Sequence, residues 1–190
     1  MAESGFGAID WKQFGVFTND AMFNEILIIY ILSTLGFTVA FYANKMFFGS
    51  FMEMVGGDKS PYFQLDEKRR KEYWSRNVAD IHALIAGPAS YFAAFYPCED
   101  ESKSIFSSQQ CLNTPARSQI WLIAISSGYV TYDMFICVFE LGYTFKKGGD
   151  FLIHHIVGLI GAVTSLAGGR FCVALSSANL FSEWTTFPMN

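Results

Sequence analysis

Apolar residues are gathered into four long runs that hydrophilic connections separate. The first run covers residues 22–48, and its centre at residues 26–43 carries no charge. A bilayer span needs about 20 predominantly apolar residues, so this run predicts a transmembrane helix. Further spans are predicted at residues 78–96, 120–143 and 151–167. The pattern predicts an all-α membrane protein, a bundle of about four to five transmembrane helices.

A fifth segment, residues 171–187, mixes apolar residues with Ser176, Ser177, Asn179, Ser182 and Glu183. We interpret it as either a re-entrant segment or a broken helix. Both are tolerated at membrane depth where they are buried in protein or line a cavity.

The hydrophilic connections are predicted at residues 56–76, 97–115 and 146–149. The first contains an uninterrupted charged run at residues 66–72. The chain has no internal repeat and no low-complexity segment, so we predict no separate second domain. The division we expect is an N-terminal lumenal or external segment at residues 1–21 and one transmembrane domain at residues 22–190.

The composition supports membrane insertion. Hydrophobic residues make up 52% of the chain and charged residues only 16%, against about 25% in ordinary soluble domains. A chain of 190 residues is too short to hide this much apolar surface in a soluble core. There is no long basic stripe with interleaved aromatic residues, so a nucleic-acid partner is not expected.

The basic residues predict an orientation. With the N-terminus lumenal or external, the cytoplasmic side holds nine of the thirteen Lys and Arg residues, as the positive-inside rule favours: Lys45, Lys59, Lys68, Arg69, Arg70, Lys71, Arg76, Lys146 and Lys147. In the alternative interpretation, the cluster at residues 68–71 is a solvated interfacial helix without topological meaning.

The cysteines are compatible with this orientation. Cys98 and Cys111 flank the acidic connection that it places outside, where disulfides persist. We expect either a Cys98–Cys111 disulfide or, in a reducing compartment, two unpaired thiols. Cys137 and Cys172 lie in apolar segments and are predicted to be buried small hydrophobes.

The three histidines carry the candidate chemistry, because ionisable residues inside a membrane are costly and usually functional. Asp150 and His154 are four residues apart and share a helix face, so the carboxylate can fix the imidazole tautomer. His155 points about 100° away. Neutral imidazole can act as a general base or a nucleophile. Asp133 lies in the middle of the third predicted span.

Each of these residues also has a structural interpretation. His82 is expected to be hydrogen-bonded within the bundle, and Asp150 can complement the helix dipole from its first turn. A zinc-like site built from His82, His154, His155 and Asp133 was considered. No two histidines are four apart and no CxxC pair is present, so we predict no metal.

Four segments, in the same order, resemble the motifs of the TLC-domain (TRAM/LAG/CLN homology) family. Residues 71–84 are similar to its Trp and Arg entry motif with a following His-Ala pair, and residues 127–133 are similar to its Gly-Tyr-x-x-x-Asp segment. Residues 149–155 resemble its His-His signature, and residues 175–177 with Trp184 resemble a later block. The resemblance covers residues about 70 to 184 and is nearest to the small TLC-domain transmembrane proteins.

The resemblance implies a helix bundle around a cavity that admits a long acyl chain. In ceramide synthases of this family the His pair transfers an acyl group from acyl-CoA to a sphingoid base. Carried over, His154 and His155 are the catalytic residues and Asp133 is a supporting carboxylate. Acyl-CoA is then a candidate co-substrate, with no bound cofactor. The lipid-binding positions we assign are His82, Asp150, Tyr129 and Arg76. The family's commonest address is the endoplasmic reticulum, and its members are linked to membrane lipid composition.

The later block departs from the family pattern. Ala174 stands where the family has Glu, Asn179 and Phe181 replace its Phe and Asn, and Glu183 replaces its Arg. The chain also stops at Asn190, where the family continues. We therefore expect either an incomplete cavity or a sequence that is a fragment.

Three functions fit these observations. The first is an acyltransferase, which predicts that the His pair faces a tunnel lined by Phe and Met and open to the cytoplasm. The second is a non-catalytic protein that binds lipids with the same cavity. The third is an accessory or structural subunit of a larger membrane complex. The altered block argues against the first function, and the retained His pair argues against the third.

Overall fold

The computed structural model describes residues 20–57, 59–96 and 103–185. Within these ranges every named element is a helix, and four helices are long and apolar enough to cross a membrane. These are α1 (Asp20–Gly56), α2 (Glu67–Phe95), α4 (Arg117–Phe139) and α5 (Gly149–Gly168). The shorter elements are η3 (Pro61–Gln64), α3 (Gln109–Asn113), α6 (Arg170–Asn179) and η4 (Leu180–Thr185). The predicted all-α membrane bundle is confirmed, and the chain is an integral multi-pass membrane protein.

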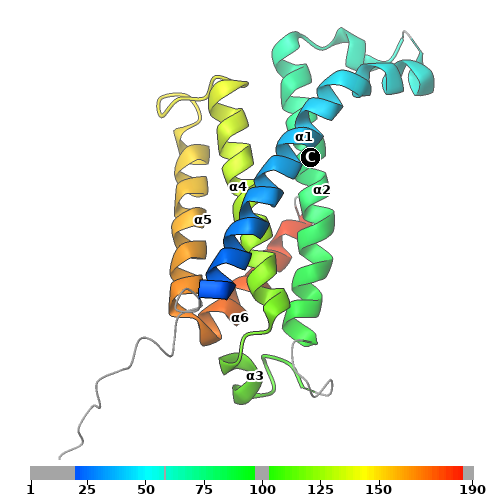
Figure 1. Ribbon diagram of the computed structural model, residues 1–190. Coiled ribbons are helices and arrows are strands. Elements are labelled where there is room, and N and C mark those ends of the chain that lie inside the picture. Colours follow the sequence, from blue (N-terminus) through cyan, green and yellow to red (C-terminus); the bar gives the residue numbers. More distant parts are fainter. Residues whose placement is uncertain (1–19, 58, 97–102, 186–190) are drawn as a thin grey trace, which may run out of the picture.

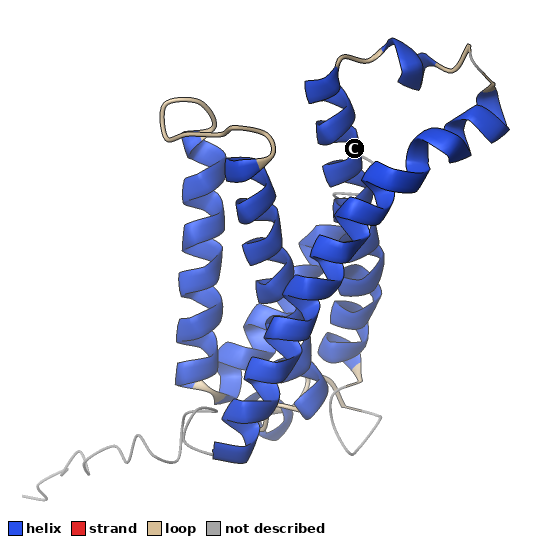
Figure 2. Ribbon diagram, turned by 45° about the horizontal axis from the view of Figure 1, so that its top comes forward, coloured by secondary structure: helices blue, strands red, loops and turns tan. Residues whose placement is uncertain are grey.

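Helix α4 is the centre of the bundle. It packs against α1, α2, α5 and α6, and it is the most buried of the four spanning helices. Helix α1 crosses α4 along much of its length, while α5 and α2 stand on opposite sides of it (Figures 1 and 2). Helix α5 packs on α4 and α6 rather than on α2, which leaves space between α2 and α5.

The contact between α1 and α4 depends on one glycine. A Cβ atom added at Gly128 would lie 2.7 Å from the Cβ of Ser33 and 2.8 Å from the carbonyl oxygen of Tyr30. Ser33 Oγ donates to the carbonyl of Ile125 at 2.8 Å, one turn before the glycine. Small residues that allow close backbone approach, with hydroxyl groups that bond across the interface, are the usual means of packing membrane helices.

The charged run at residues 66–72 is helical. Asp66 caps α2, since its Oδ1 accepts from the backbone N–H of Arg69 at 2.8 Å. Lys71 lies 3.4 Å from Glu67, and Lys68 pairs with the residue four positions on, a spacing that supports a helix. The connection predicted at residues 56–76 therefore ends where α2 begins at Glu67, and the helix at residues 68–71 agrees with the alternative interpretation of that cluster. Only the later part of α2 is apolar.

Glycines in left-handed conformations end the later helices. Helix α4 stops at Phe139, shortly before Gly142, whose φ is +68°, so the predicted span at residues 120–143 is too long. Gly169, with φ +57°, separates α5 from α6. The fifth segment is a broken helix made of α6 and η4, which agrees with one of the two interpretations of its sequence.

The described cysteines fall into two groups. Cys111 is disulfide-bonded, whereas Cys137 is a buried free thiol and Cys172 a partly buried one. Cys98 lies outside the described residues, so its pairing with Cys111 stays a prediction.

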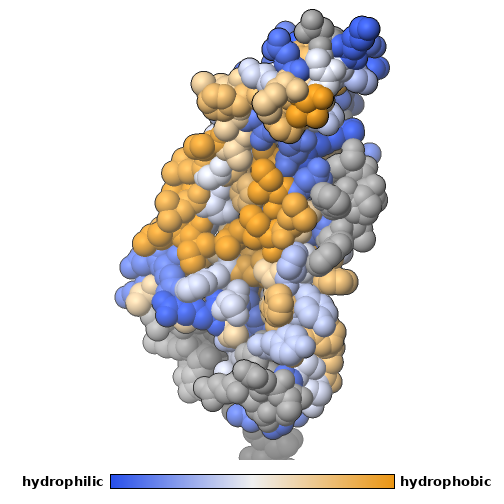
Figure 3. All heavy atoms as spheres, turned by 90° about the vertical axis from the view of Figure 1, so that its right-hand side faces the viewer, coloured by the Kyte–Doolittle hydropathy of each residue, from blue (hydrophilic) through white to orange (hydrophobic). Residues whose placement is uncertain are grey.

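The outer surfaces of the helices suit a lipid environment. Large apolar side chains of α1 are widely exposed, among them Leu32 and Val39. Figure 3 shows hydrophobic side chains gathered across the middle of one face, with hydrophilic ones above them at the upper end and again below them. Exposed apolar surface of this extent is expected where side chains contact lipid rather than water.

Candidate functional site

A cavity of about 450 Å³ lies between α2, α4 and α5. Its walls come from three helices, the α4–α5 connection and η4, and the lining residues are Glu72, Ser75, Arg76, Ala79, Tyr129, Val130, Asp133, Cys137, Leu141, Tyr143, Phe151, His154, His155, Gly158 and Glu183. The lining positions recur at helical spacing, at residues 72, 75, 76 and 79 of α2 and at residues 129, 130, 133 and 137 of α4. Each helix therefore presents one face to the cavity.

The rim of the cavity lies at one end of the bundle. Glu72 and Arg76 belong to the first turns of α2, and Tyr143 belongs to the connection between α4 and α5. These segments lie at the upper end of the bundle in Figure 1, where the basic connections predicted to be cytoplasmic also lie. Burial raises the pKa of Tyr143, so its phenol stays protonated and is available as a hydrogen-bond donor.

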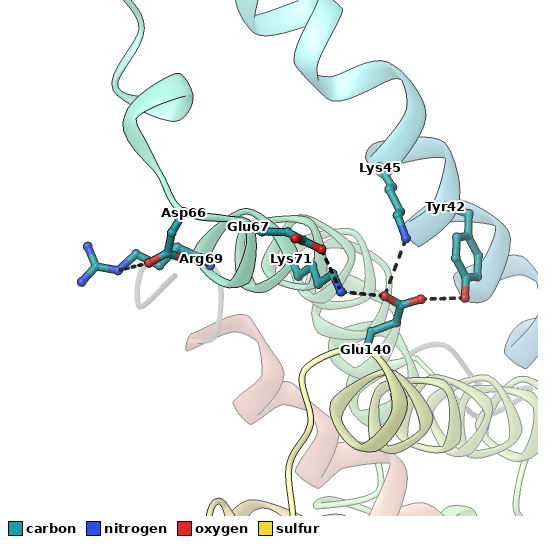
Figure 4. Close-up of polar contacts among 7 residues, drawn as sticks. All are labelled: Tyr42, Lys45, Asp66, Glu67, Arg69, Lys71 and Glu140. Carbon is teal, nitrogen blue, oxygen red and sulfur yellow. Dashed lines mark hydrogen bonds and ion pairs between the residues drawn. The ribbon is translucent and has the colours of Figure 1, made fainter.

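An ionic contact ties three helices together near this rim (Figure 4). Glu140, at the end of α4, lies 3.6 Å from Nζ of Lys45 on α1 and 3.4 Å from Nζ of Lys71 on α2. Tyr42 donates its hydroxyl to Oε1 of Glu140 at 3.2 Å. Burial of Glu140 opposes ionisation, but the tyrosine and the two lysines outweigh it and lower the pKa of the carboxyl group.

The polar centre of the cavity is a buried pair, Asp133 and His155. Nε2 of His155 lies 3.0 Å from Oδ2 of Asp133, and Ser75 donates its hydroxyl to Oδ1 at 3.2 Å. The histidine is 7% exposed and the aspartate 5%. Buried ionisable groups are tolerated when they are paired and hydrogen-bonded, and this pair meets both conditions.

The remaining nitrogen of His155 is also occupied. Nδ1 lies 2.9 Å from the carbonyl oxygen of Phe151, one turn earlier in α5, and a carbonyl can only accept. Nδ1 therefore carries a proton, and a second proton must lie between Nε2 and Asp133 for that contact to be a hydrogen bond. Neither nitrogen of His155 is free to take a proton from a third group.

His154 differs from His155 in its exposure and in its hydrogen bonding. It is exposed and lines the cavity, and its ring stands edge-on to that of His155, with 5.5 Å between the ring centroids. Among the described contacts of the chain, no hydrogen bond occupies either of its nitrogens. His154 is thus the histidine of the pair that can act on a molecule in the cavity.

The predicted partner of the His pair differs from the one observed. Asp150 is exposed in the first turn of α5 and is not among the cavity-lining residues. The carboxylate that binds a histidine is Asp133, and the histidine it binds is His155. Asp150 fits the interpretation in which a carboxylate complements the N-terminus of its helix.

His82 lies behind the cavity wall. It stacks on Tyr129, with ring centroids 3.9 Å apart and planes within 5°. Nε2 lies 3.2 Å from the hydroxyl of Ser126, and Nδ1 lies 3.9 Å from Oε2 of Glu183. The cavity touches Tyr129 but not His82. This fits a histidine bonded within the bundle and not the lipid-binding position that the sequence analysis assigned to His82.

The lining differs from the expected tunnel of Phe and Met. Among the described residues that line the cavity, Phe151 is the one Phe and none is Met. Six of the lining residues have ionisable side chains: two Glu, one Asp, one Arg and two His. Sequence reasoning missed Ser75, Tyr143 and Glu183. The spacing of Glu72, Arg76 and Ala79 along one face of α2 was a signal that could have located this wall.

A metal centre is not formed by the described residues. No group of three or more His, Cys, Asp or Glu side chains lies close enough together there to hold an ion.

Comparison with known proteins identifies the family. The model of the TLC domain matches residues 72–190, which include every cavity-lining residue. The chain is 28% identical over 192 residues to TLC domain-containing protein 4 C of Dictyostelium discoideum, covering 98% of this chain and 64% of that relative. It thus spans somewhat less than two thirds of the relative's length, and no solved structure matches it. Since the family model covers more than half of the sequence, the chain belongs to the TLC domain family.

Proposed function

We propose that the cavity binds the reacting end of a long-chain acyl thioester and transfers its acyl group to an acceptor lipid. The observation that carries the proposal is the difference in hydrogen bonding between the two histidines of the pair. Asp133 and the carbonyl of Phe151 occupy both nitrogens of His155, while His154 faces the cavity with its nitrogens open.

In this reaction the acceptor's amine or hydroxyl attacks the thioester carbon. The carbon–sulfur bond breaks as the new carbon–nitrogen or carbon–oxygen bond forms. His154 takes the proton from the acceptor and passes it to the leaving thiolate, so that acylated lipid and free coenzyme A are the products. A positioned base of this kind contributes about 10²–10⁴-fold to the rate of such reactions.

His155 and Asp133 have a positioning role. They hold the start of α5 against α4, so that the neighbouring His154 ring points into the cavity. A histidine whose orientation a hydrogen-bonded carboxylate fixes is a common device for setting the geometry of a site. Tyr143 and Arg76 at the rim are candidates for contacts with the polar end of the thioester.

The second candidate function is lipid binding without chemistry, either alone or as an accessory subunit of a membrane complex. The polar lining is compatible with it, because polar and charged side chains can hold the headgroup of a lipid without any group being transferred. The departures at Ala174 and Glu183 from the family pattern point the same way. In that case the Asp133–His155 pair stabilises the bundle and His154 only contacts the bound lipid.

One experiment separates the two functions. The purified full chain is reconstituted in vesicles with a long-chain acyl-CoA, and free thiol is measured with and without an acceptor, first a long-chain amine and then a lysophospholipid. Thiol release that requires the acceptor supports acyl transfer. Saturable binding of acyl-CoA without thiol release from folded protein supports the lipid-binding function instead.

The endoplasmic reticulum is the membrane we propose for the protein, because it is the commonest address of the family. Fluorescence of a tagged chain beside markers of several organelles tests this. We propose the lipids of that membrane as binding partners. If the protein is an accessory subunit, other membrane proteins are partners as well.

A further inference from the structure

A second, smaller hollow adjoins the cavity along α2. It measures about 250 Å³ and is lined by Leu65, Arg69, Glu72, Tyr73 and Arg76. Glu72 and Arg76 also line the cavity, so the two spaces share one wall. The hollow extends about one turn further toward the start of α2 than the cavity does, and it therefore lies on the outer side of the rim.

The hollow has a fixed shape. Its four α2 positions, 69, 72, 73 and 76, lie within an arc of about 100° on one face of the helix. Arg70, outside this face, donates from Nε to the carbonyl of Leu65 at 2.9 Å and from Nη2 to the carbonyl of Phe63 at 3.0 Å. These bonds hold Leu65 against the first turn of α2, so the fold itself forms the hollow.

The charges around the hollow favour an anion. Lys68 lies 3.5 Å from Glu72 and offsets the charge of that carboxylate. Arg69 pairs with Asp66 at 3.9 Å, but the two side chains are 71% and 68% exposed, and exposed pairs of this kind are weak. The guanidinium group of Arg69 can therefore bind another anion at little cost.

Arg76 supplies a second positive charge. It is exposed, and among the described contacts of the chain no hydrogen bond or ion pair involves its guanidinium group. The nearby lysines differ, since Lys45 and Lys71 both bind Glu140, whereas Arg69 points away from that carboxylate (Figure 4). Two guanidinium groups in one hollow are thus available to a ligand.

Phosphate is the anion that suits two arginines best. Guanidinium groups bind phosphate oxygens through paired N–H···O bonds. Arg69 and Arg76 are seven residues apart, about 10.5 Å along the helix axis, a distance that their long side chains can close around one phosphate or two linked ones. Tyr73 lies between them and is 40% exposed, so it offers aromatic surface to the organic part of a phosphate ester.

We propose that this hollow binds the phosphate groups of a ligand whose other end enters the cavity. Two sources have this chemistry, the diphosphate of coenzyme A and the headgroup of an anionic lipid. The wall shared at Glu72 and Arg76 allows one molecule to occupy both spaces. With coenzyme A as the source, the subsite rests on the proposed acyl transfer, and it places the phosphates outside the rim and the thioester toward His154.

The test compares free coenzyme A with pantetheine, which lacks the phosphates, as ligands of the full chain in phosphatidylcholine nanodiscs. Arg69→Gln is the informative variant, because Arg69 lines the hollow and not the cavity. Its side chain is exposed, so the change should leave the fold intact. Lys59→Gln removes one exposed positive charge from the connection between α1 and α2 and is the matched control.

At low salt, the Kd of coenzyme A is expected to rise about tenfold in Arg69→Gln and to change little in Lys59→Gln. The Kd of pantetheine is expected to be the same in all three proteins. Nanodiscs with phosphatidic acid distinguish the two sources. If the lipid headgroup is the ligand, native mass spectrometry should find phosphatidic acid retained by the wild type and by Lys59→Gln but not by Arg69→Gln, while binding of coenzyme A does not depend on Arg69.

Two results overturn the proposal. If Arg69→Gln matches the wild type with both coenzyme A and phosphatidic acid, the hollow holds no phosphate. If Lys59→Gln loses as much affinity as Arg69→Gln, the attraction comes from general surface charge. The outcome is separable from catalysis, because thiol release by Arg69→Gln with an unchanged KM for acyl-CoA removes the subsite and leaves the reaction. Arg69-dependent binding without thiol release removes the reaction and leaves the subsite.

Discussion

Asp133 and His155 are 22 residues apart in the sequence, and their side chains meet at 3.0 Å between Oδ2 and Nε2. This contact joins the central helix α4 to α5 and occupies the one nitrogen of His155 that the backbone carbonyl of Phe151 leaves open. The surroundings of the two adjacent histidines therefore differ, since both nitrogens of His155 are hydrogen-bonded within the bundle and His154 is exposed.

Replacing Asp133 with alanine is expected to destabilise the bundle strongly. The change leaves His155 and the hydroxyl of Ser75 buried without their shared acceptor, and breaking a buried pair from one side costs about 3–5 kcal/mol. Thermal unfolding of the detergent-purified protein measures the loss. Ser75→Ala, which removes only one neutral donor, should cost about 1 kcal/mol, and equal effects of the two variants would contradict the buried pair.

The crossing of α1 over α4 predicts opposite outcomes at two glycines. Gly128→Ala places a Cβ within 2.8 Å of Ser33 and Tyr30, and overpacking of this kind costs about 1–3 kcal/mol. Gly36→Ala meets nothing within 4 Å and is expected to be neutral or slightly stabilising, because alanine favours helix by up to about 1 kcal/mol. The two melting temperatures, measured in the same detergent, check this. A Gly36 variant that is as unstable as the Gly128 variant would contradict the close approach.

Glu140 predicts a stability difference that depends on pH. Its pKa in the folded state lies below the unfolded value of about 4.3, because Tyr42, Lys45 and Lys71 outweigh the effect of burial. The stabilisation is fully present above that unfolded value and is lost as the pH falls through the folded pKa. The free energy of unfolding of the wild type should therefore be higher than that of Glu140→Gln by about 1 kcal/mol or less at neutral pH.

The difference in stability between the wild type and Glu140→Gln, followed by thermal unfolding from pH 7 to pH 3, should decrease toward zero as the pH falls. Taking the difference cancels the other carboxyl groups that titrate in this window. A gap that stays constant or widens toward low pH would show that the ionised carboxylate of Glu140 is not the stabilising species.

The loop between α2 and α4 predicts a covalent link. Cys111 is disulfide-bonded, and Cys98 is the partner that the sequence predicts. Closing a loop of about 15 residues stabilises a protein by about 3 kcal/mol in the chain-entropy account, so Cys98→Ser and Cys111→Ser should lower the melting temperature equally. Mass spectrometry of non-reduced peptides identifies the pair, and alkylation of Cys98 without prior reduction would exclude it.

Hydropathy predicted the existence of the four spans because each is a long apolar run in a chain with few charges. It did not predict where α2 begins. The polarity of residues 66–72 indicates a loop, whereas the spacing of their opposite charges indicates a helix. The pairs Glu67–Lys71 and Lys68–Glu72 contained the missing information. The end of α4 depended on Gly142, whose left-handed conformation is visible only in the fold.

Of the site residues expected from the sequence, His154, His155, Asp133, Tyr129 and Arg76 line the cavity, whereas His82 and Asp150 do not. Sequence alone relates residues that are close along one helix, and this is why Asp150 was paired with His154. The partner of the His pair comes from another helix, and only the packing of α4 on α5 brings Asp133 to His155. The wall formed by Ser75 and Glu183 comes from segments far from the His pair in sequence, and no local pattern predicts it.

The most direct test of the proposed acyl transfer is the rate of acceptor-dependent thiol release from acyl-CoA by His154→Ala, measured beside Asp150→Ala as the exposed control from the same helix turn. His154 is exposed, so its removal should leave thermal stability within about 0.5 kcal/mol of wild type. The account predicts a loss of about 10²-fold or more in rate for His154→Ala and little change for Asp150→Ala. A His154→Ala protein that is folded and releases thiol at the wild-type rate would contradict it.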